Sequence, residues 1–166
     1  MEFIVLTDEV RVAVARYVSA LLVRHPIYLA KLTSFHAQDA DSSTSARNRA
    51  LDNMLYLYGL YEQEIQKAIF MICRRASDAE FIYADGGLVV DEPWRDRYGI
   101  PFDIHAPLTP DLALEVLPFP FPEDDRTIAH ISDMTNQGVA RMNRIVIGSA
   151  NRFVFSRQAP PTTFIA

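Results

Sequence analysis

Three side chains could support metal-assisted or general-base chemistry. Asp103 and His105 are two residues apart, so a β-strand would place both on one face. Asp85 ends another strand-like run, and its carboxylate could join them as a third ligand or as a base. This alternative predicts a metal-assisted hydrolase or nuclease that uses Asp85, Asp103 and His105. The main interpretation is a capping aspartate beside a surface or hydrogen-bonded histidine, because a metal site usually needs three well-spaced ligands.

A second candidate site is an acidic, aromatic segment that spans residues 91–98. Its candidate binding residues are Asp91, Glu92, Trp94, Asp96 and Tyr98. Trp and Tyr among charged neighbours are typical of protein contact surfaces, although a solvated loop can have the same composition. We therefore expect this segment to bind another protein. We place such a partner in conflict between bacteria and phages or rival cells, as a working hypothesis.

Several enzyme classes with a recognisable signature are not indicated. The chain has no Gly-x-Ser-x-Gly elbow, His-Glu-x-x-His helix, Cys-x-x-Cys pair or phosphate-binding loop. Asp85-Gly86-Gly87 predicts a hairpin turn, since it lacks the glycine spacing of a dinucleotide site. Cys73 lies on the apolar side of a predicted helix, which favours a core position over a nucleophile. We expect a non-catalytic binding protein without a cofactor.

Residues 81–110 predict a small sheet that would position the candidate site residues. Three short apolar runs, 81–83, 88–90 and 102–104, are separated by glycines, aspartates and a polar loop. The prolines of 107–110 (PLTP) predict a rigid turn that stops strand pairing. Residues 112–117 fit either a strand or a short helix. Residues 152–156 (RFVFS) predict a final strand with Phe153 and Phe155 as buried aromatics on one face.

Helical spacing of apolar residues dominates the first half of the chain. A helix is expected to begin at Thr7 and to end or kink at Pro26, with a second helical piece to about residue 35 and a polar linker over 36–45. Residues 46–75 predict the longest helix, in which Gly59 marks a close approach by the first helix. A late helix is expected over 131–149.

These elements predict a single α+β domain over residues 1–157, with a helical part at 7–75, a mixed part at 78–157 and a tail at 158–166. Amphipathic helices would pack on a small, mostly antiparallel sheet, with the late helix followed by the final strand. Neither the strand order nor the oligomeric state is predicted.

Charge is distributed unevenly along this chain of 166 residues and net charge −5. The net charge is +1 over residues 1–77, −10 over 78–125 and +4 over 126–166. Nucleic acid is an unlikely partner of the middle block, because phosphate contacts need clustered Lys and Arg. The simplest expectation is that the acidic block and the basic C-terminal block neutralise each other in the fold.

The expected location is the cytoplasm, without membrane contact. One cysteine excludes an intrachain disulfide, which fits a reducing compartment. No signal peptide is visible, and no apolar run approaches the roughly 20 residues of a membrane-spanning helix.

Motifs spread over residues 6–157 resemble a mainly bacterial family, domain of unknown function 4238 (DUF4238). The similar segments are 22–26 (LVRHP), 81–85 (FIYAD), 107–110 (PLTP), Asn143 in the late helix and 150–156. The chain departs from the family at Gly86-Gly87, where a proline often follows the aspartate, and it lacks the family's opening His-x-x-Pro segment. The resemblance implies a fold pattern but no known reaction.

Overall fold

The computed structural model describes residues 2–25, 30, 33–34, 43–76, 78–90, 103–117, 127–150 and 152–157. The predicted α+β class is confirmed, and a late helix does precede the final strand. In chain order the elements are β1 (Glu2–Val5), α1 (Asp8–Arg24), α3 (Ser43–Ile65), β2 (Ile69–Arg75), β3 (Tyr83–Ala84), β4 (Val89–Val90), β5 (Ile104–Thr109), β6 (Leu112–Leu117), β7 (Ile128–Met134), α4 (Asn136–Ser149) and β8 (Val154–Phe155).

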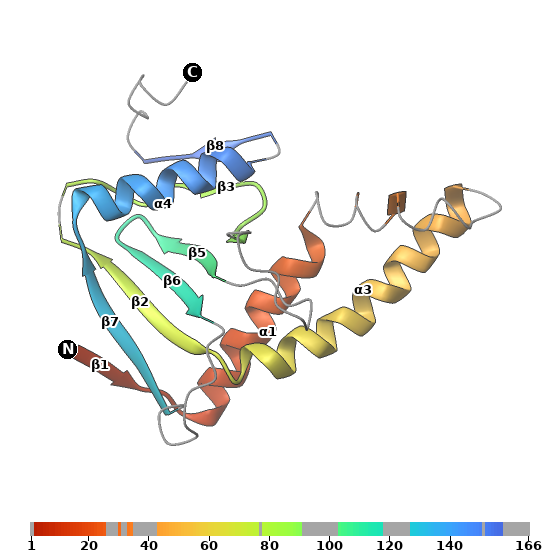
Figure 1. The fold of residues 1–166 in the computed structure, drawn as a ribbon, viewed down its shortest axis with the longest axis horizontal. Coiled ribbons are helices and arrows are strands. Elements are labelled where there is room, and N and C mark those ends of the chain that lie inside the picture. Colours follow the sequence, from red (N-terminus) through yellow and green to blue (C-terminus); the bar gives the residue numbers. More distant parts are fainter. Residues whose placement is uncertain are drawn as a thin grey trace.

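The main sheet has six strands in the order β1-β7-β2-β6-β5-β4. Figure 1 shows the strands β1, β7, β2, β6 and β5 of this sheet, with α3 extending away from them. Neighbouring strands of the sheet are antiparallel except for the parallel pair β2–β7. A separate two-stranded ribbon pairs β3 with β8 in antiparallel fashion. The predicted mostly antiparallel sheet is therefore confirmed among the described strands.

The predicted helix over 46–75 is wrong in its last third. The helix ends at Ile65, where the amides of Lys67 and Ala68 donate to carbonyls three residues earlier and tighten the last turn. Residues 69–75 then form β2, so the predicted division into a helical part over 7–75 is also wrong. The run Ile69–Cys73 is apolar without interruption, as expected for a strand between two packed layers.

The predicted late helix begins too early. Residues 128–134 form β7, and α4 begins after Thr135, whose Oγ1 accepts a hydrogen bond of 3.3 Å from the Gly138 amide. Thr135 is therefore the helix cap, and the apolar residues before it belong to a strand. Residues 112–117, which fit two interpretations, form the strand β6.

The expected turn at 107–110 is also displaced. Pro107 and Thr109 belong to β5, with a register irregularity between them, and the chain turns at Pro110-Asp111. The neighbouring strand β4 pairs only with Ile104 and His105. Pro107 lies beyond that short pairing and next to the register irregularity, where proline is tolerated in a strand.

The prediction for α1 is confirmed at both ends. Thr7 Oγ1 accepts from the Val10 amide, and the helix ends at Arg24, before Pro26. The predicted close approach at Gly59 is wrong, because no atom outside the helix backbone lies within 4 Å of where its side chain would start. The piece expected to end at about residue 35 falls mostly outside the described residues, and α3 begins at Ser43, inside the predicted linker.

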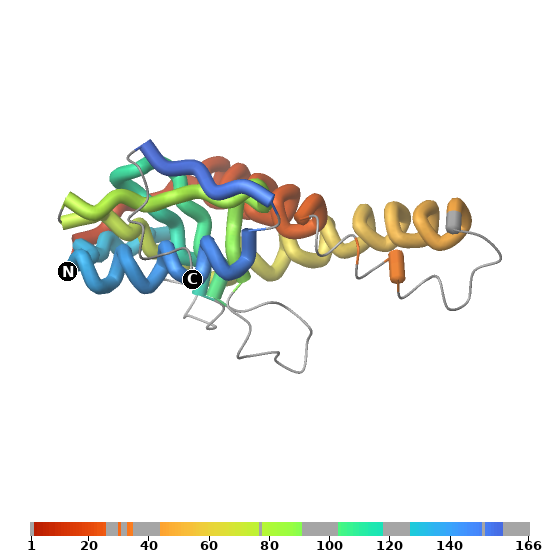
Figure 2. Tube along the Cα trace, turned by 90° about the horizontal axis from the view of Figure 1, so that it is seen from above, coloured from red at the N-terminus to blue at the C-terminus, as the bar shows by residue number. Residues whose placement is uncertain are grey.

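Helices pack on both faces of the sheet, and α3 extends beyond it. Helix α1 and the C-terminal end of α3 contribute to one hydrophobic core with Phe70, Ile104 and Val116 of the strands. Helix α4 packs on the opposite face against Cys73 and Ala113. Figure 2 shows α1 and α4 on opposite sides of the sheet and the N-terminal half of α3 projecting away from it.

Candidate functional site

A row of polar side chains crosses the face of the sheet on which α4 packs. The strand register aligns His130 of β7, Met71 of β2, Glu115 of β6 and His105 of β5. Met71 contacts the core formed with α4, and residues paired across a sheet point to the same face. The row therefore brings two imidazoles and one carboxylate to the α4 side of the sheet.

His105 and Glu115 form the centre of the candidate site. His105 Nδ1 lies 3.2 Å from Glu115 Oε1, and the two side chains are only 11% and 13% exposed. The contact lacks hydrogen-bond geometry, so Nδ1 is buried without a hydrogen bond. A proton on this imidazole would complete an ion pair with the carboxylate.

Cys73 is a third member of this cluster, placed on β2 next to Glu115. Burial, together with the charge and hydrogen bonding of the Glu115 carboxylate, raises the pKa of the Cys73 thiol to about 12. The thiol is therefore neutral near pH 7. The predicted core position of Cys73 is confirmed, but the residue lies on a strand and not on a helix.

A cavity of about 270 Å³ opens beside the His105–Glu115 pair, under α4. Its lining residues are Asp103, His105, Glu115, Leu117, Met134, Gly138, Arg141, Met142 and Ile145. Asp103 has φ +52°, a left-handed conformation that no other non-glycine residue adopts in the described part of the chain. Aspartate tolerates this conformation better than most residues, and such positions cluster at functional sites.

Asp85 does not belong to this site. Its Oδ2 accepts a hydrogen bond of 3.0 Å from the Arg152 amide, and its own amide donates to the Phe153 carbonyl at 3.1 Å. Among the described residues, no three His, Cys, Asp or Glu side chains are placed to hold a metal ion. The predicted convergence of Asp85, Asp103 and His105 is therefore wrong: Asp103 and His105 line one cavity, whereas Asp85 connects β3 to β8.

The predicted binding residues Asp91, Glu92, Trp94, Asp96 and Tyr98 lie outside the described residues. In the sequence the segment lies between β4 and β5, and Val90 of β4 pairs with Ile104 of β5 at the edge of the six-stranded sheet.

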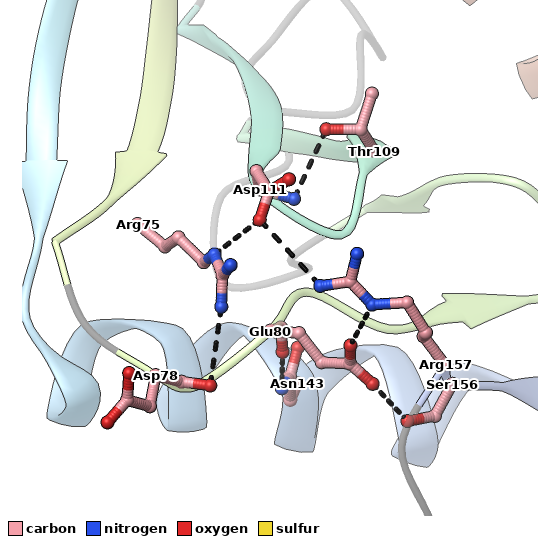
Figure 3. Close-up of polar contacts among 8 residues, drawn as sticks. All are labelled: Arg75, Asp78, Glu80, Thr109, Asp111, Asn143, Ser156 and Arg157. Carbon is pink, nitrogen blue, oxygen red and sulfur yellow. Dashed lines mark hydrogen bonds and ion pairs between the residues drawn. The ribbon is translucent and has the colours of Figure 1, made fainter.

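A second polar cluster joins the acidic middle block to the basic C-terminal block (Figure 3). Arg157 Nε lies 3.4 Å from Glu80 Oε2, and its Nη2 lies 4.0 Å from Asp111 Oδ1. Arg75 also pairs with Asp111, and Ser156 Oγ donates to Glu80 Oε1 at 2.5 Å. Arg157 of the basic block therefore pairs with Glu80 as expected, whereas Asp111 pairs more closely with Arg75, which lies outside that block.

Asn143 ties this cluster to α4. Its Nδ2 donates to the Glu80 carbonyl at 2.8 Å, and its Oδ1 accepts from the Ile82 amide at 3.2 Å, as Figure 3 shows for Glu80. One amide side chain therefore satisfies a donor and an acceptor of the extended segment that leads into β3. This cluster holds elements together, and the cavity beside His105 is the better candidate for chemistry.

Sequence reasoning missed Glu115 and Arg141 as site residues. Glu115 is the only charged residue in the apolar strand LALEVL, which was a usable signal for a paired buried carboxylate. Arg141 gave no comparable signal, because it stands on the exposed side of an amphipathic helix.

No family model, curated protein or solved structure matches this chain. The resemblance to domain of unknown function 4238 therefore stays a prediction. Within the described residues, no helix combines the length and the apolar character that crossing a bilayer requires.

Proposed function

We propose that this protein is a non-catalytic binding protein whose partner is another protein and whose contact surface is the segment 91–98. The observation that carries the proposal is the composition of this segment, three carboxylates with Trp94 and Tyr98, between two strands that pair at the sheet edge. Aromatic side chains beside charges are enriched where proteins contact each other.

The rest of the acidic block gives indirect support. Glu80 and Asp111 are engaged by arginines, and Asp85 by a backbone amide, so these carboxylates serve the fold. The proposed location is the cytoplasm, where a chain with one buried cysteine needs no disulfide. The proposed setting is conflict between bacteria and phages or rival cells.

The test is a charge reversal of Asp91, Glu92 and Asp96 to lysine, measured against a partner first isolated by pull-down and then purified. We expect slower association and a changed salt dependence in surface plasmon resonance, because long-range charge acts mostly on the on-rate. Trp94→Ala should instead speed dissociation, since an aromatic anchor acts after the encounter.

Asp52→Lys is the matched control, because Asp52 is exposed on α3, away from the sheet edge. It should leave both rate constants close to those of the unmodified protein. If the triple variant binds with the same rate constants and salt response as this control, the segment is not the contact surface.

The cavity beside His105 supports a second candidate function, the binding of a small zwitterion. Arg141 offers a cation for a ligand carboxylate, and Asp103 and Glu115 offer anions for an ammonium group. Leu117 and Ile145 add apolar walls, and a cavity of about 270 Å³ suits a ligand the size of an amino acid. The metal-assisted alternative has weaker support, because Asp85 is engaged elsewhere.

Calorimetric titration with a panel of free amino acids tests this second candidate. Binding of an apolar amino acid should be lost in Arg141→Gln and kept in Arg144→Gln, a change on the same helix outside the cavity lining. Absence of binding by every member of the panel would remove this candidate. Titration with Zn²⁺, Mn²⁺ and Mg²⁺ in the same instrument tests the metal-assisted alternative.

A further inference from the structure

Strand β1 is an exposed apolar edge of the six-stranded sheet. Among the described strands its one neighbour is β7, and all four of its residues are exposed. Phe3, Ile4 and Val5 are 58%, 47% and 70% exposed. Edge strands usually carry a lysine, a proline or a bulge that prevents pairing with another chain, and β1 has none of these.

The hydrogen-bonding direction of each β1 residue follows from its pairing with β7. The Leu6 amide donates to the Thr127 carbonyl at 2.6 Å, in continuation of the antiparallel register. In an antiparallel pair, alternate residues direct both backbone groups to the same neighbour. Ile4 therefore faces β7, and the N–H and C=O groups of Phe3 and Val5 face outward from the sheet.

We infer that β1 pairs in antiparallel fashion with β1 of a second copy of this chain, across a two-fold axis at Ile4. In this register Phe3 lies opposite Val5 of the second copy, and Val5 opposite its Phe3. Each such pair exchanges two backbone hydrogen bonds, so the four bonds use every outward group of the two residues. The two sheets become one continuous sheet.

The side chains fit the same register. A two-fold axis perpendicular to the sheet keeps equivalent faces on the same side, so Phe3 meets Val5 on one face and Ile4 meets Ile4 on the other. No charge lies at the axis, because the axis passes through Ile4. The charged residue of β1, Glu2, lies two residues away and pairs with Arg74 at 3.1 Å. This self-complementarity favours a second copy over a foreign strand.

A four-residue strand is a small interface, so the dimer should be weak and should depend on concentration. Interfaces below about 1,200 Å² are typical of transient complexes. We expect a dissociation constant on the order of 10 to several hundred micromolar. Sedimentation velocity from about 5 μM to about 1 mM should therefore show a shift from monomer to dimer.

Val5→Pro is the decisive variant. It removes one outward donor and leaves the amides that face β7, and proline is accepted on sheet edges. We expect at least a tenfold loss of dimer affinity with an unchanged circular dichroism spectrum and Tm. Ile4→Pro is the contrasting variant, because it removes an amide that faces β7 and should lower the Tm.

Val5→Lys is a second variant for use if Val5→Pro does not fold. It replaces an exposed side chain and keeps every backbone hydrogen bond between β1 and β7. The Val5→Lys variant should also weaken dimerisation. Amide exchange gives an independent measurement: the Phe3 and Val5 amides should become protected as concentration rises, whereas the Ile4 amide is protected throughout.

Two results would overturn the inference. One is that the unmodified protein stays monomeric at about 1 mM, or that the Val5→Lys variant dimerises as strongly as the unmodified protein. The other is protection of Phe3 and Val5 only after an extended peptide is added, which would make a foreign strand the occupant of this edge.

Discussion

The face of the sheet on which α1 packs and the face on which α4 packs bury different kinds of side chain. Under α1 and the end of α3, the cluster is almost wholly apolar, with Phe70, Leu88 and Ile104 among its largest buried members. Under α4 the buried set includes Cys73, His105 and the nearby carboxylate of Glu115. One face is packed from apolar side chains, and the other also holds a thiol, an imidazole and a carboxylate.

A charged side chain, Arg11, is also buried on the apolar face, and its contacts explain how it is tolerated. Its Nη1 donates to the carbonyls of Gln66 and Ala68 at 3.1 and 2.9 Å, and its Nη2 donates to the Ile128 carbonyl at 3.4 Å. The guanidinium also lies 4.6 Å from the centre of the Phe70 ring. Arg11 therefore satisfies backbone groups at the bend between α3 and β2, where no regular hydrogen bonds are available.

The largest expected effect follows from Phe70→Ala on the apolar face. The ring is 1% exposed, so its removal leaves a cavity and should cost about 3–5 kcal/mol of the free energy of unfolding. Urea unfolding followed by circular dichroism measures the loss. Phe153→Ala is the control, because this exposed ring should contribute less than about 0.5 kcal/mol. Equal losses in the two variants would contradict the assignment of the core.

Arg11→Met should give the second largest effect. The change keeps the aliphatic volume but removes the donor to the buried Ala68 carbonyl and to the partly buried Gln66 carbonyl, at a cost of about 2–3 kcal/mol. Arg16→Met on the same helix is the control, since its pair with Glu62 is exposed and contributes roughly 0–1 kcal/mol. If Arg11→Met were as stable as Arg16→Met, the carbonyl contacts would not stabilise the fold.

The sequence predicts the apolar face better than the α4 face, for a physical reason. The stripe of α1 and its Thr7 cap are local signals, and both are confirmed. Strand β2 was mistaken for helix because residues 69–75 are buried by contacts from β6 and β7, which local spacing does not report. Its apolar residues also continue the helical spacing of α3.

The same limit applies to the candidate site. Asp103 and His105 are two residues apart and do line one cavity, so the local part of the hypothesis is confirmed. Asp85 is grouped with them because it ends a strand-like run, but its partner, Arg152, is 67 positions away in the chain. Glu115 reaches His105 only because β5 and β6 pair in one particular register.

An alkaline loss of stability should distinguish the α4 face from the apolar face. Because the pKa of Cys73 is raised in the folded state, the folded protein keeps a proton that the unfolded chain releases above about pH 9. Stability is therefore fully present below pH 9 and falls as the pH rises toward 12, by up to about 1.4 kcal/mol per pH unit.

Cys73→Ala isolates this contribution from that of the tyrosines and lysines, which titrate in both proteins. Chemical unfolding at pH 8 and pH 10 should show a steeper loss in the unmodified protein than in Cys73→Ala. Parallel losses would mean that the thiol ionises as freely in the fold as in the unfolded chain.

The smallest expected effect concerns the two phenylalanines at β8, Phe153 and Phe155, which the sequence predicts to be buried. Phe153 and Phe155 are instead 60% and 56% exposed, and their rings lie 6.3 Å apart on the outside of the β3–β8 ribbon. Phe155→Ala should therefore change the free energy of unfolding by less than about 0.5 kcal/mol.

Ser156→Ala, next to it, should cost more, about 1 kcal/mol, because it removes the 2.5 Å hydrogen bond to the buried Glu80 carboxylate. Thermal melting of the two single variants checks this order. A larger loss from Phe155→Ala would mean that β8 is held to the molecule by its rings, whereas the contacts of Asp85 and Glu80 indicate that polar groups hold it.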